Sequence, residues 1–481
     1  MNLAQSATKI FFARLGKSLI GFLAVIVFSR ELGASPLGIY YPFVALLGIL
    51  SIPADLGIKS ATEKRVSEGK NSSAYVATAI SIKTPIILII SAIIILGSGY
   101  VNRYLGASLA IPLVVGLIIN QFGQLSLSIL RGELRVGETA IAEILQPLSW
   151  LAVGYILYLE GFGVHGLVYG YIFGGVLILI YGSLKISTNI GIPTIDHARS
   201  LFEYGKYSVV SSVGGYVYSW LDIIILTFFV MDNGLVTRSS IGAYENAWRL
   251  TLFALIIGRA IGTTVFPQFS RWDAEDARER IEKVIPTAAL LSLAVVIPAF
   301  VGTAILSKEL LSTLFGPEFT VAWIALTILS AEKILQSIHG VIARPLQAID
   351  RPDLAAYATA VAIVVNIVLN IVLISQFGIV GAAIATTVSF AVNTILHARF
   401  LSRFLNIYFP FREISWIVLS SGAMGVIIYL VHSVVDIRSI VELTVIVLIG
   451  IISYSAMVLI YRPIRMKLGK ITESVLSKRI V

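Results

Sequence analysis

Long apolar stretches constrain the fold of this chain more than any other feature. An α-helix needs about 20 apolar residues to cross a bilayer, and fourteen stretches of roughly that length lie near 9–29, 37–54, 75–98, 107–130, 139–159, 165–184, 206–230, 241–266, 285–306, 320–343, 355–375, 379–401, 413–432 and 441–461. Only 13% of the residues are charged, against about 25% in a soluble domain, and the mean hydropathy is +0.90. We therefore predict an all-α polytopic membrane protein with fourteen transmembrane helices.

The positions of lysine and arginine predict the orientation of these helices. An even number of spans places both termini on one side, and 25 of the 36 Lys and Arg residues fall in the loops and tails of that side. The opposite loops hold five, namely Arg30, Arg103, Arg238, Lys308 and Arg438. Because cytoplasmic loops carry the excess of Lys and Arg, we expect cytoplasmic termini and a location in the cell membrane. The same bias explains the net charge of +9 without a nucleic-acid partner.

A weak internal repeat predicts the domain organisation. Four matches occur in chain order: Gly16-Lys17 with Gly205-Lys206, Gly38 and Tyr40 with Gly242 and Tyr244, Gly137-Glu138 with Pro352-Asp353, and FGVHG at 162–166 with FGIVG at 377–381. They indicate two six-helix lobes related by a pseudo-two-fold axis along the membrane normal, followed by two C-terminal helices. The expected boundaries are 1–199, 200–402 and 403–481, with the long loop near 185–205 as the linker. Parallel repeats are typical of transporters whose substrate site lies between the halves.

The segment FSRELGASPLGIYYPFVAL at 28–46 resembles the first-hairpin signature of the polysaccharide-biosynthesis flippases. These belong to the multidrug/oligosaccharidyl-lipid/polysaccharide exporter superfamily. The segment FPQFSRW at 266–272 and the arrangement of six, six and two spans agree with this resemblance. It implies two lobes around a central cavity and movement of a lipid-linked oligosaccharide to the outer leaflet by alternating access. The carrier would be a polyprenyl or dolichyl phosphate or pyrophosphate, and the product would serve surface polysaccharide or glycoprotein assembly.

Cations inside the spans are the candidate phosphate ligands. Arg14 and Lys17 lie three residues apart on one face of the first span, and Arg249 and Arg259 lie in the eighth. A charged side chain in a bilayer is costly, about 2.5–3.5 kcal/mol on insertion scales, so such residues usually face water or protein. Arginine also binds phosphate in a bidentate manner. Two alternatives stay open: Lys17 can extend to the cytoplasmic surface, and Arg259 can sit at the inner interface.

Acidic and imidazole side chains near these cations are candidates for ion coupling or charge pairing. Glu245 lies one helical turn before Arg249 and can pair with it. Asp222 lies late in the seventh span, where it can pair with Arg249 or bind a coupling ion. In the tenth span Glu332, with Gln336, shares one face with His339, which suits either a proton or cation site or polar contacts between helices.

Amide side chains within the spans are candidates for the glycan path. Asn120 and Gln124 lie one turn apart in the fourth span, and Asn366 and Asn370 lie one turn apart in the eleventh. For the second pair, hydrogen bonding between helices is the favoured alternative. Lys83 enters the third span about two turns deep, and we expect its amine to extend to the membrane interface.

The sequence does not indicate an enzyme. It contains no HExxH motif and no loop long enough for a catalytic domain, and no nucleotide, cofactor or metal site is expected. The first hypothesis is therefore a monomeric flippase, whose partners are its lipid-linked glycan, membrane lipids and the glycosyltransferases or glycan polymerase or ligase of the same pathway. The alternative is an ion-coupled exporter of drugs or small amphiphiles from the same superfamily. A membrane glycosyltransferase ranks last.

Overall fold

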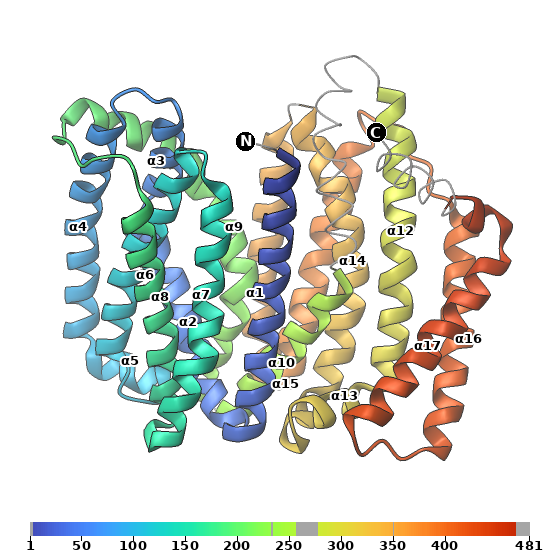
Figure 1. Ribbon diagram of the computed structural model, residues 1–481. Helices are drawn as coiled ribbons and strands as arrows, with labels where there is room; N and C mark the ends of the chain where they lie inside the picture. Colours follow the sequence, from blue (N-terminus) through green and yellow to red (C-terminus); the bar gives the residue numbers. More distant parts are fainter. Residues whose placement is uncertain (1–2, 232–233, 256–277, 350, 468–481) are drawn as a thin grey trace. The chain divides into compact units, whose positions relative to one another are not determined.

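The computed structural model describes residues 3–231, 234–255, 278–349 and 351–467. Within these ranges the side chains at 3–12, 14, 207, 209–214, 217–218 and 347 lie outside the description. The described residues form helices joined by short connections (Figure 1). The chain divides into two compact units, Met1–Gly242 and Ala243–Val481, and the division falls inside helix α10.

The first unit is a helical bundle. Its elements are α1 (Leu3–Leu32), α2 (Ala34–Asp55), α3 (Ile58–Ser67), α4 (Ser72–Leu96), α5 (Ser98–Leu105), α6 (Ala110–Gly132), α7 (Val136–Leu157), η1 (Tyr158–Phe162), α8 (Val164–Lys185), α9 (Ile195–Val230) and the start of α10 (Arg238–Thr251). Helix α7 packs against both α1 and α8, and α6 packs against α8 and α3. The short helices α3 and α5 lie at opposite ends of this bundle (Figure 1).

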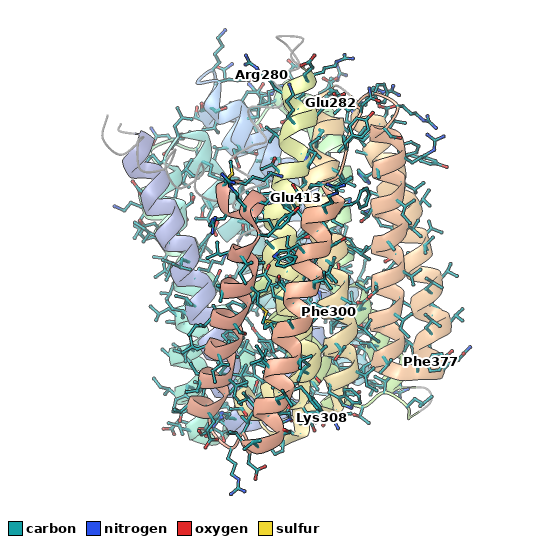
Figure 2. The ribbon with its side chains drawn as sticks, turned by 90° about the vertical axis from the view of Figure 1, so that its right-hand side faces the viewer. Arg280, Glu282, Phe300, Lys308, Phe377 and Glu413 are labelled. Atoms are coloured by element: carbon teal, nitrogen blue, oxygen red, sulfur yellow. The ribbon has the colours of Figure 1, made fainter. Side chains whose placement is uncertain are left out.

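The second unit is also a helical bundle. It contains the rest of α10, then η2 (Leu252–Leu255), α12 (Arg278–Ile305), α13 (Ser307–Leu314), η3 (Pro317–Ala322), α14 (Trp323–Ala348), α15 (Pro352–Leu401), α16 (Phe411–Val434) and α17 (Ile440–Ile460). Helix α12 runs from the charged end at Arg280 and Glu282, past Phe300, towards Lys308 at the opposite end (Figure 2). A charged end, an apolar middle and a second charged end are typical of a membrane span.

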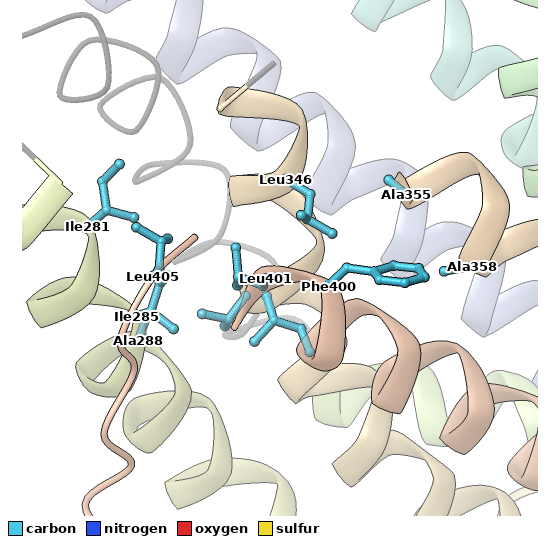
Figure 3. Close-up of a cluster of buried hydrophobic side chains, with 11 residues drawn as sticks. Ile281, Ile285, Ala288, Leu346, Ala355, Ala358, Phe400, Leu401 and Leu405 are labelled. Atoms are coloured by element: carbon cyan, nitrogen blue, oxygen red, sulfur yellow. The ribbon is translucent and has the colours of Figure 1, made fainter. Parts of the chain in front are cut away.

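A buried apolar cluster joins α12, α14 and α15 near the charged end of α12. Ile281 and Ile285 of α12 meet Leu346 of α14 and Leu401 of α15, all of them at most 2% exposed (Figure 3). Burying aliphatic side chains of this size contributes roughly 1.5–3 kcal/mol each relative to exposure in water. The cluster fixes the ends of these three helices relative to one another.

Ten helices in the described part of the chain are long and apolar enough to cross a membrane. This confirms an all-helical, multi-pass membrane protein. The expected spans 9–29 and 206–230 fall within α1 and α9, while 241–266 begins in α10 and ends outside the described residues. The count of fourteen spans, the lobe symmetry and the boundaries at 199 and 402 therefore stay predictions.

Two glycines matched in the sequence repeat adopt nearly the same backbone conformation. Gly163 ends η1 with φ 53° and ψ −130°, and Gly378 turns the chain within α15 with φ 56° and ψ −132°. Positive φ is unfavourable for residues that carry a Cβ. The turn at Gly378 divides α15 into two helices, which correspond to the spans expected at 355–375 and 379–401. The FGxxG match thus reflects one local structure used twice.

A second pair of matched glycines lies at one helix crossing. A Cβ atom built on Gly38 of α2 would lie 1.7 Å from the carbonyl oxygen of Arg238, and one built on Gly242 of α10 would lie 2.1 Å from that of Ala34. Each glycine thus meets the carbonyl four residues before the other. The crossing is reciprocal, and the two backbones touch because neither glycine carries a side chain.

Replacing Gly38 by alanine is expected to destabilise the protein by about 1–3 kcal/mol, the usual cost of overpacking. The added methyl group would overlap the backbone of α10, which cannot move aside as a flexible side chain does. The melting temperature in detergent, followed by tryptophan fluorescence, measures this effect. Gly302→Ala is the matched control, because a Cβ at Gly302 of α12 meets nothing within 4 Å. An unchanged melting temperature for Gly38→Ala would show that the crossing is not close-packed.

The connection before α9 is held by hydrogen bonds to the turn between α6 and α7. Glu133 accepts bonds from the backbone amides of Ser187 and Thr188, at 2.9 and 2.7 Å, and Arg135 donates to the Lys185 carbonyl and to Ser187. The pKa of Glu133 is lowered: partial burial alone would raise it, but these hydrogen bonds favour the carboxylate. The connection is short, because α9 already begins at Ile195.

Candidate substrate site

Of the candidate phosphate ligands on helix α1, the structure describes the side chain of Lys17. Its Nζ lies 3.0 Å from Oε2 of Glu143 on α7, and the two side chains are 45% and 34% exposed. An exposed pair of this kind contributes about 0–1 kcal/mol to stability. Lys17 is thus accessible to a ligand. Position 14 belongs to α1, but the side chain of Arg14 lies outside the description.

Helix α10 positions Arg249 against Glu245. Arg249 Nη2 lies 2.8 Å from Glu245 Oε1, one helical turn apart, which confirms the pairing that the sequence predicts. Glu245 is 2% exposed and Arg249 is 30% exposed. The carboxylate of Glu245 is thus buried within the second unit, while part of the guanidinium group of Arg249 stays accessible to a ligand. Arg259 falls outside the described residues, and Asp222 is half-buried on α9.

Helices α2, α4 and α6 meet at a buried charged network that the sequence did not reveal. Lys83 Nζ lies 2.5 Å from Oδ1 of Asp55 and 2.7 Å from Oε1 of Gln121. Lys83 is 1% exposed. The expectation that its amine reaches the membrane interface is therefore wrong. Burying an ammonium group requires a partner of opposite charge, and Asp55, 28 residues earlier, supplies it.

A pocket opens beside this network in the first unit. It is lined by Asp55, Lys59, Asn120, Gln121, Gln124 and Tyr216, among others. Most of its roughly 430 Å³ is open space at the mouth and not an enclosed cavity. Gln121 donates to the backbone carbonyl of Ser51 at 3.3 Å while it accepts from Lys83. The two amides assigned to the glycan path from their spacing, Asn120 and Gln124, thus line one pocket.

A second charged group lies in the second unit on α14. Glu332 and Lys333 form an ion pair, and both side chains are at most 2% exposed. Lys333 Nζ also lies 5.6 Å from the ring centre of Trp248, within the range of a cation–π interaction. Glu332 is therefore a paired carboxylate deep in the helix bundle, which is where a coupling site or a structural ion pair would lie.

The imidazole predicted on the same face of α14 meets a second histidine from α15. The rings of His339 and His397 lie 4.6 Å apart, edge to face. His397 bonds through Nδ1 to the carbonyl of Asn393 at 2.9 Å. His397 was missed because it is an isolated histidine near the end of the twelfth expected span, and only the fold brings it to His339.

The amides of α15 bond within α15 itself. Asn366 donates to Ser389 across the turn at 3.1 Å, and Asn370 donates to the carbonyl of Asn366 at 3.0 Å. Asn366 and Asn370 are 3% and 0% exposed. The bond between Asn366 and Ser389 is what the alternative of hydrogen bonding between helices predicts, whereas the bond of Asn370 stays within one helical segment. A role for these two residues in the glycan path remains a prediction.

Buried polar and charged side chains thus occur in both helical units of a membrane protein. Such residues are expensive within a bilayer and usually mark the pathway of a substrate or an ion. Together with the helical architecture, they define the class: a polytopic membrane transporter. The profile of the family described as "Polysaccharide biosynthesis protein" matches residues 27–324. The chain belongs to this family.

Two relatives from Haloferax volcanii resemble the whole chain. The probable low-salt glycan biosynthesis flippase is 44% identical over 466 residues, which cover 97% of both chains. The probable flippase AglR is 30% identical over 95% of this chain and 96% of its own length. The resemblance recognised in the sequence is therefore confirmed at the level of the family.

Two solved structures share the fold. The lipid II flippase MurJ in an inward closed conformation superposes with a TM-score of 0.80 at 18% identity, and the match covers 94% of this chain and 98% of MurJ. An inward-facing multidrug resistance transporter of the MATE family, from the MOP superfamily, gives a TM-score of 0.66 at 17% identity over 80% of this chain and 95% of its own. At such identities the likeness shows the fold alone.

Proposed function

We propose that this protein is a flippase that carries a lipid-linked oligosaccharide from the cytoplasmic to the outer leaflet by alternating access. The observation that carries the proposal is the alignment with a probable glycan biosynthesis flippase over 97% of both chains. The protein is thus a transporter and not an enzyme. Both termini face the cytoplasm in this proposal, as the distribution of Lys and Arg predicts.

The chemistry of such a substrate fits the polar and charged residues of the two units. Its phosphate needs accessible cations, and Lys17 and Arg249 both keep part of their charge exposed beside a carboxylate. Its glycan needs polar contacts, and the pocket with Asn120 and Gln124 offers them. We assign phosphate binding to these two cations together with Arg14 and Arg259.

Switching between inward- and outward-facing states needs a source of free energy. Moving one charge through the membrane potential is worth about 2.3 kcal/mol per 100 mV, so an anionic substrate bound by fixed cations changes the cost of switching. Only a difference in affinity between the two states can drive the change. We propose Asp222, Glu332 and His339 as candidates for a compensating proton or Na⁺.

Loss of the protein from its native cell tests the proposed function. The lipid-linked glycan should then accumulate in the cytoplasmic leaflet, where a membrane-impermeant lectin cannot reach it, and glycan at the cell surface should fall. The alternative, an ion-coupled exporter of small amphiphiles, has support from the MATE-like fold. If this alternative holds, cells that lack the protein should have normal glycan at their surface and should be more sensitive to cationic drugs.

Replacing Glu143 by glutamine is expected to strengthen the binding of dolichyl phosphate. The change removes a negative charge and releases Lys17 from its partner at 3.0 Å. We expect the dissociation constant to fall roughly two- to fivefold, the size of an exposed charge interaction. Glu160→Gln, which removes an exposed carboxylate beyond the end of α7, is the matched control. Weaker or equal binding by Glu143→Gln would argue against a phosphate contact at Lys17.

A further inference from the structure

The pocket of the first unit is built on a rigid corner. The turn from α2 to α3 passes through Leu56 and Gly57, with φ of 47° and 76°. A Cβ on Gly57 would lie 2.2 Å from the carbonyl oxygen of Gly205 on α9, so the turn is packed directly against that helix. Asp55 also accepts the backbone N–H of Lys59 at 3.2 Å, which ties the start of α3 to the end of α2.

The ion pair between Lys83 and Asp55 also holds two of the side chains that line the pocket, Asp55 and Gln121. Oδ1 of Asp55 and Oε1 of Gln121 accept bonds from the same ammonium group of Lys83. Gln121 uses its amide N–H on the carbonyl of Ser51, so its orientation is determined at both ends. A buried ion pair is weak evidence for stability but can hold polar groups in one geometry.

Several polar groups that line the pocket have no protein partner. Within the described part of the chain, no hydrogen bond or ion pair is formed by the amides of Asn120 and Gln124, the ammonium group of Lys59 or Oδ2 of Asp55. The aromatic ring of Tyr216 lies among them. The pocket thus offers two amides that both donate and accept, one carboxylate oxygen that accepts, and one ammonium group that donates.

This set of groups favours hydroxyl groups over phosphate. A phosphate would meet the carboxylate of Asp55 as well as the ammonium group of Lys59, and the charge of Lys83 is already opposed by that carboxylate at 2.5 Å. A sugar ring presents neighbouring hydroxyl groups that donate to a carboxylate and exchange bonds with amides, and its C–H face packs on an aromatic ring. The pocket differs in this respect from Lys17, which is exposed, and Arg249, which is partly exposed.

We propose that this pocket of the first unit binds an uncharged sugar of the lipid-linked glycan, with Asn120 and Gln124 as its contacts and the Lys83–Asp55 pair as the support that positions them. The proposal rests on the proposed function and assigns a different part of the same substrate. Phosphate and glycan are then recognised by separate groups of residues. Lys83 is a positioning residue and does not touch the sugar.

A carrier with a sugar and a carrier without one test this assignment. The phosphodiester that carries glucose also has about one negative charge less than the phosphomonoester, so the sugar contact is judged from the change that the variant makes in the preference. The dissociation constants of dolichyl phosphate and dolichyl phosphate glucose are measured by tryptophan fluorescence on the purified full-length protein in detergent. We expect the wild type to bind the glucose-bearing carrier about tenfold more tightly, the effect of one or two hydrogen bonds. The double variant Asn120→Leu/Gln124→Leu should lose this preference and still bind dolichyl phosphate as the wild type does.

Each other outcome overturns the proposal. A double variant that keeps the preference would show that the sugar binds elsewhere, and one that loses both carriers equally while melting like the wild type would show a phosphate site. The single variants Asn120→Ala and Gln124→Ala repeat the test if the double variant does not fold. Gln146→Leu, a half-buried amide on α7 outside the pocket lining, is the control. A wild type that binds neither carrier would overturn the proposed function as well.

Discussion

Replacing Arg249 by glutamine is expected to reduce transport of the lipid-linked glycan about 10- to 100-fold at equal expression. Charge-assisted hydrogen bonds to a phosphate contribute about 1.5–3 kcal/mol, which corresponds to this range. Arg249→Lys should keep partial transport, because a point charge still attracts phosphate although the bidentate contact is lost. Initial rates of transport into proteoliposomes measure both variants.

The contact with Glu245 requires a second variant for a clear interpretation. Glu245 is 2% exposed, and Arg249→Gln removes its partner at 2.8 Å, so a loss of transport could come from the buried carboxylate alone. The double variant Glu245→Gln/Arg249→Gln removes both charges. Low transport in the double variant would support phosphate binding by Arg249, whereas recovery would assign it a structural role. Full transport by Arg249→Gln alone would remove it from the mechanism.

Replacing Lys83 by methionine is expected to lower the free energy of unfolding by about 3–5 kcal/mol. The change leaves Asp55 without its partner at 2.5 Å, and breaking a buried ion pair on one side has this cost. Gln121 loses its donor at the same time. Thermal unfolding in detergent and the fraction of monodisperse protein after extraction measure the effect.

The double variant Lys83→Met/Asp55→Asn separates charge from packing. Asparagine keeps an oxygen for the N–H of Lys59 but carries no charge, and uncharged replacements of a buried ion pair are often nearly neutral for stability. We expect most of the lost stability to return. A double variant that is less stable than Lys83→Met alone would show that the pair itself contributes to folding.

The sequence predicts elements and short-range contacts well because both depend on local spacing. The pair Glu245–Arg249 follows from residues four apart on one helix. The FGxxG match follows from a turn that only glycine adopts easily, as Gly163 and Gly378 show. The pairing was predicted from the sequence, and the FGxxG match was found there as part of a repeat; neither depends on how separate helices pack.

The charged network was not predictable in the same way. Lys83 lies two turns inside its expected span, where a lysine often reaches the interface, and Asp55 lies just after the second expected span, 37–54. Their pairing depends on how α2, α4 and α6 pack, over 28 and 38 residues of separation. The contact between His339 and His397 has the same origin, because it depends on how α14 and α15 pack.

The central claim, movement of a lipid-linked glycan across the bilayer, is tested most directly by a sided assay in proteoliposomes. A labelled lipid-linked oligosaccharide is placed in one leaflet, and its arrival in the other is followed with a membrane-impermeant lectin, with the membrane potential and the H⁺ and Na⁺ gradients set separately. The account predicts protein-dependent arrival that Arg249→Gln largely removes. Arrival at the rate of empty liposomes under every gradient would contradict it.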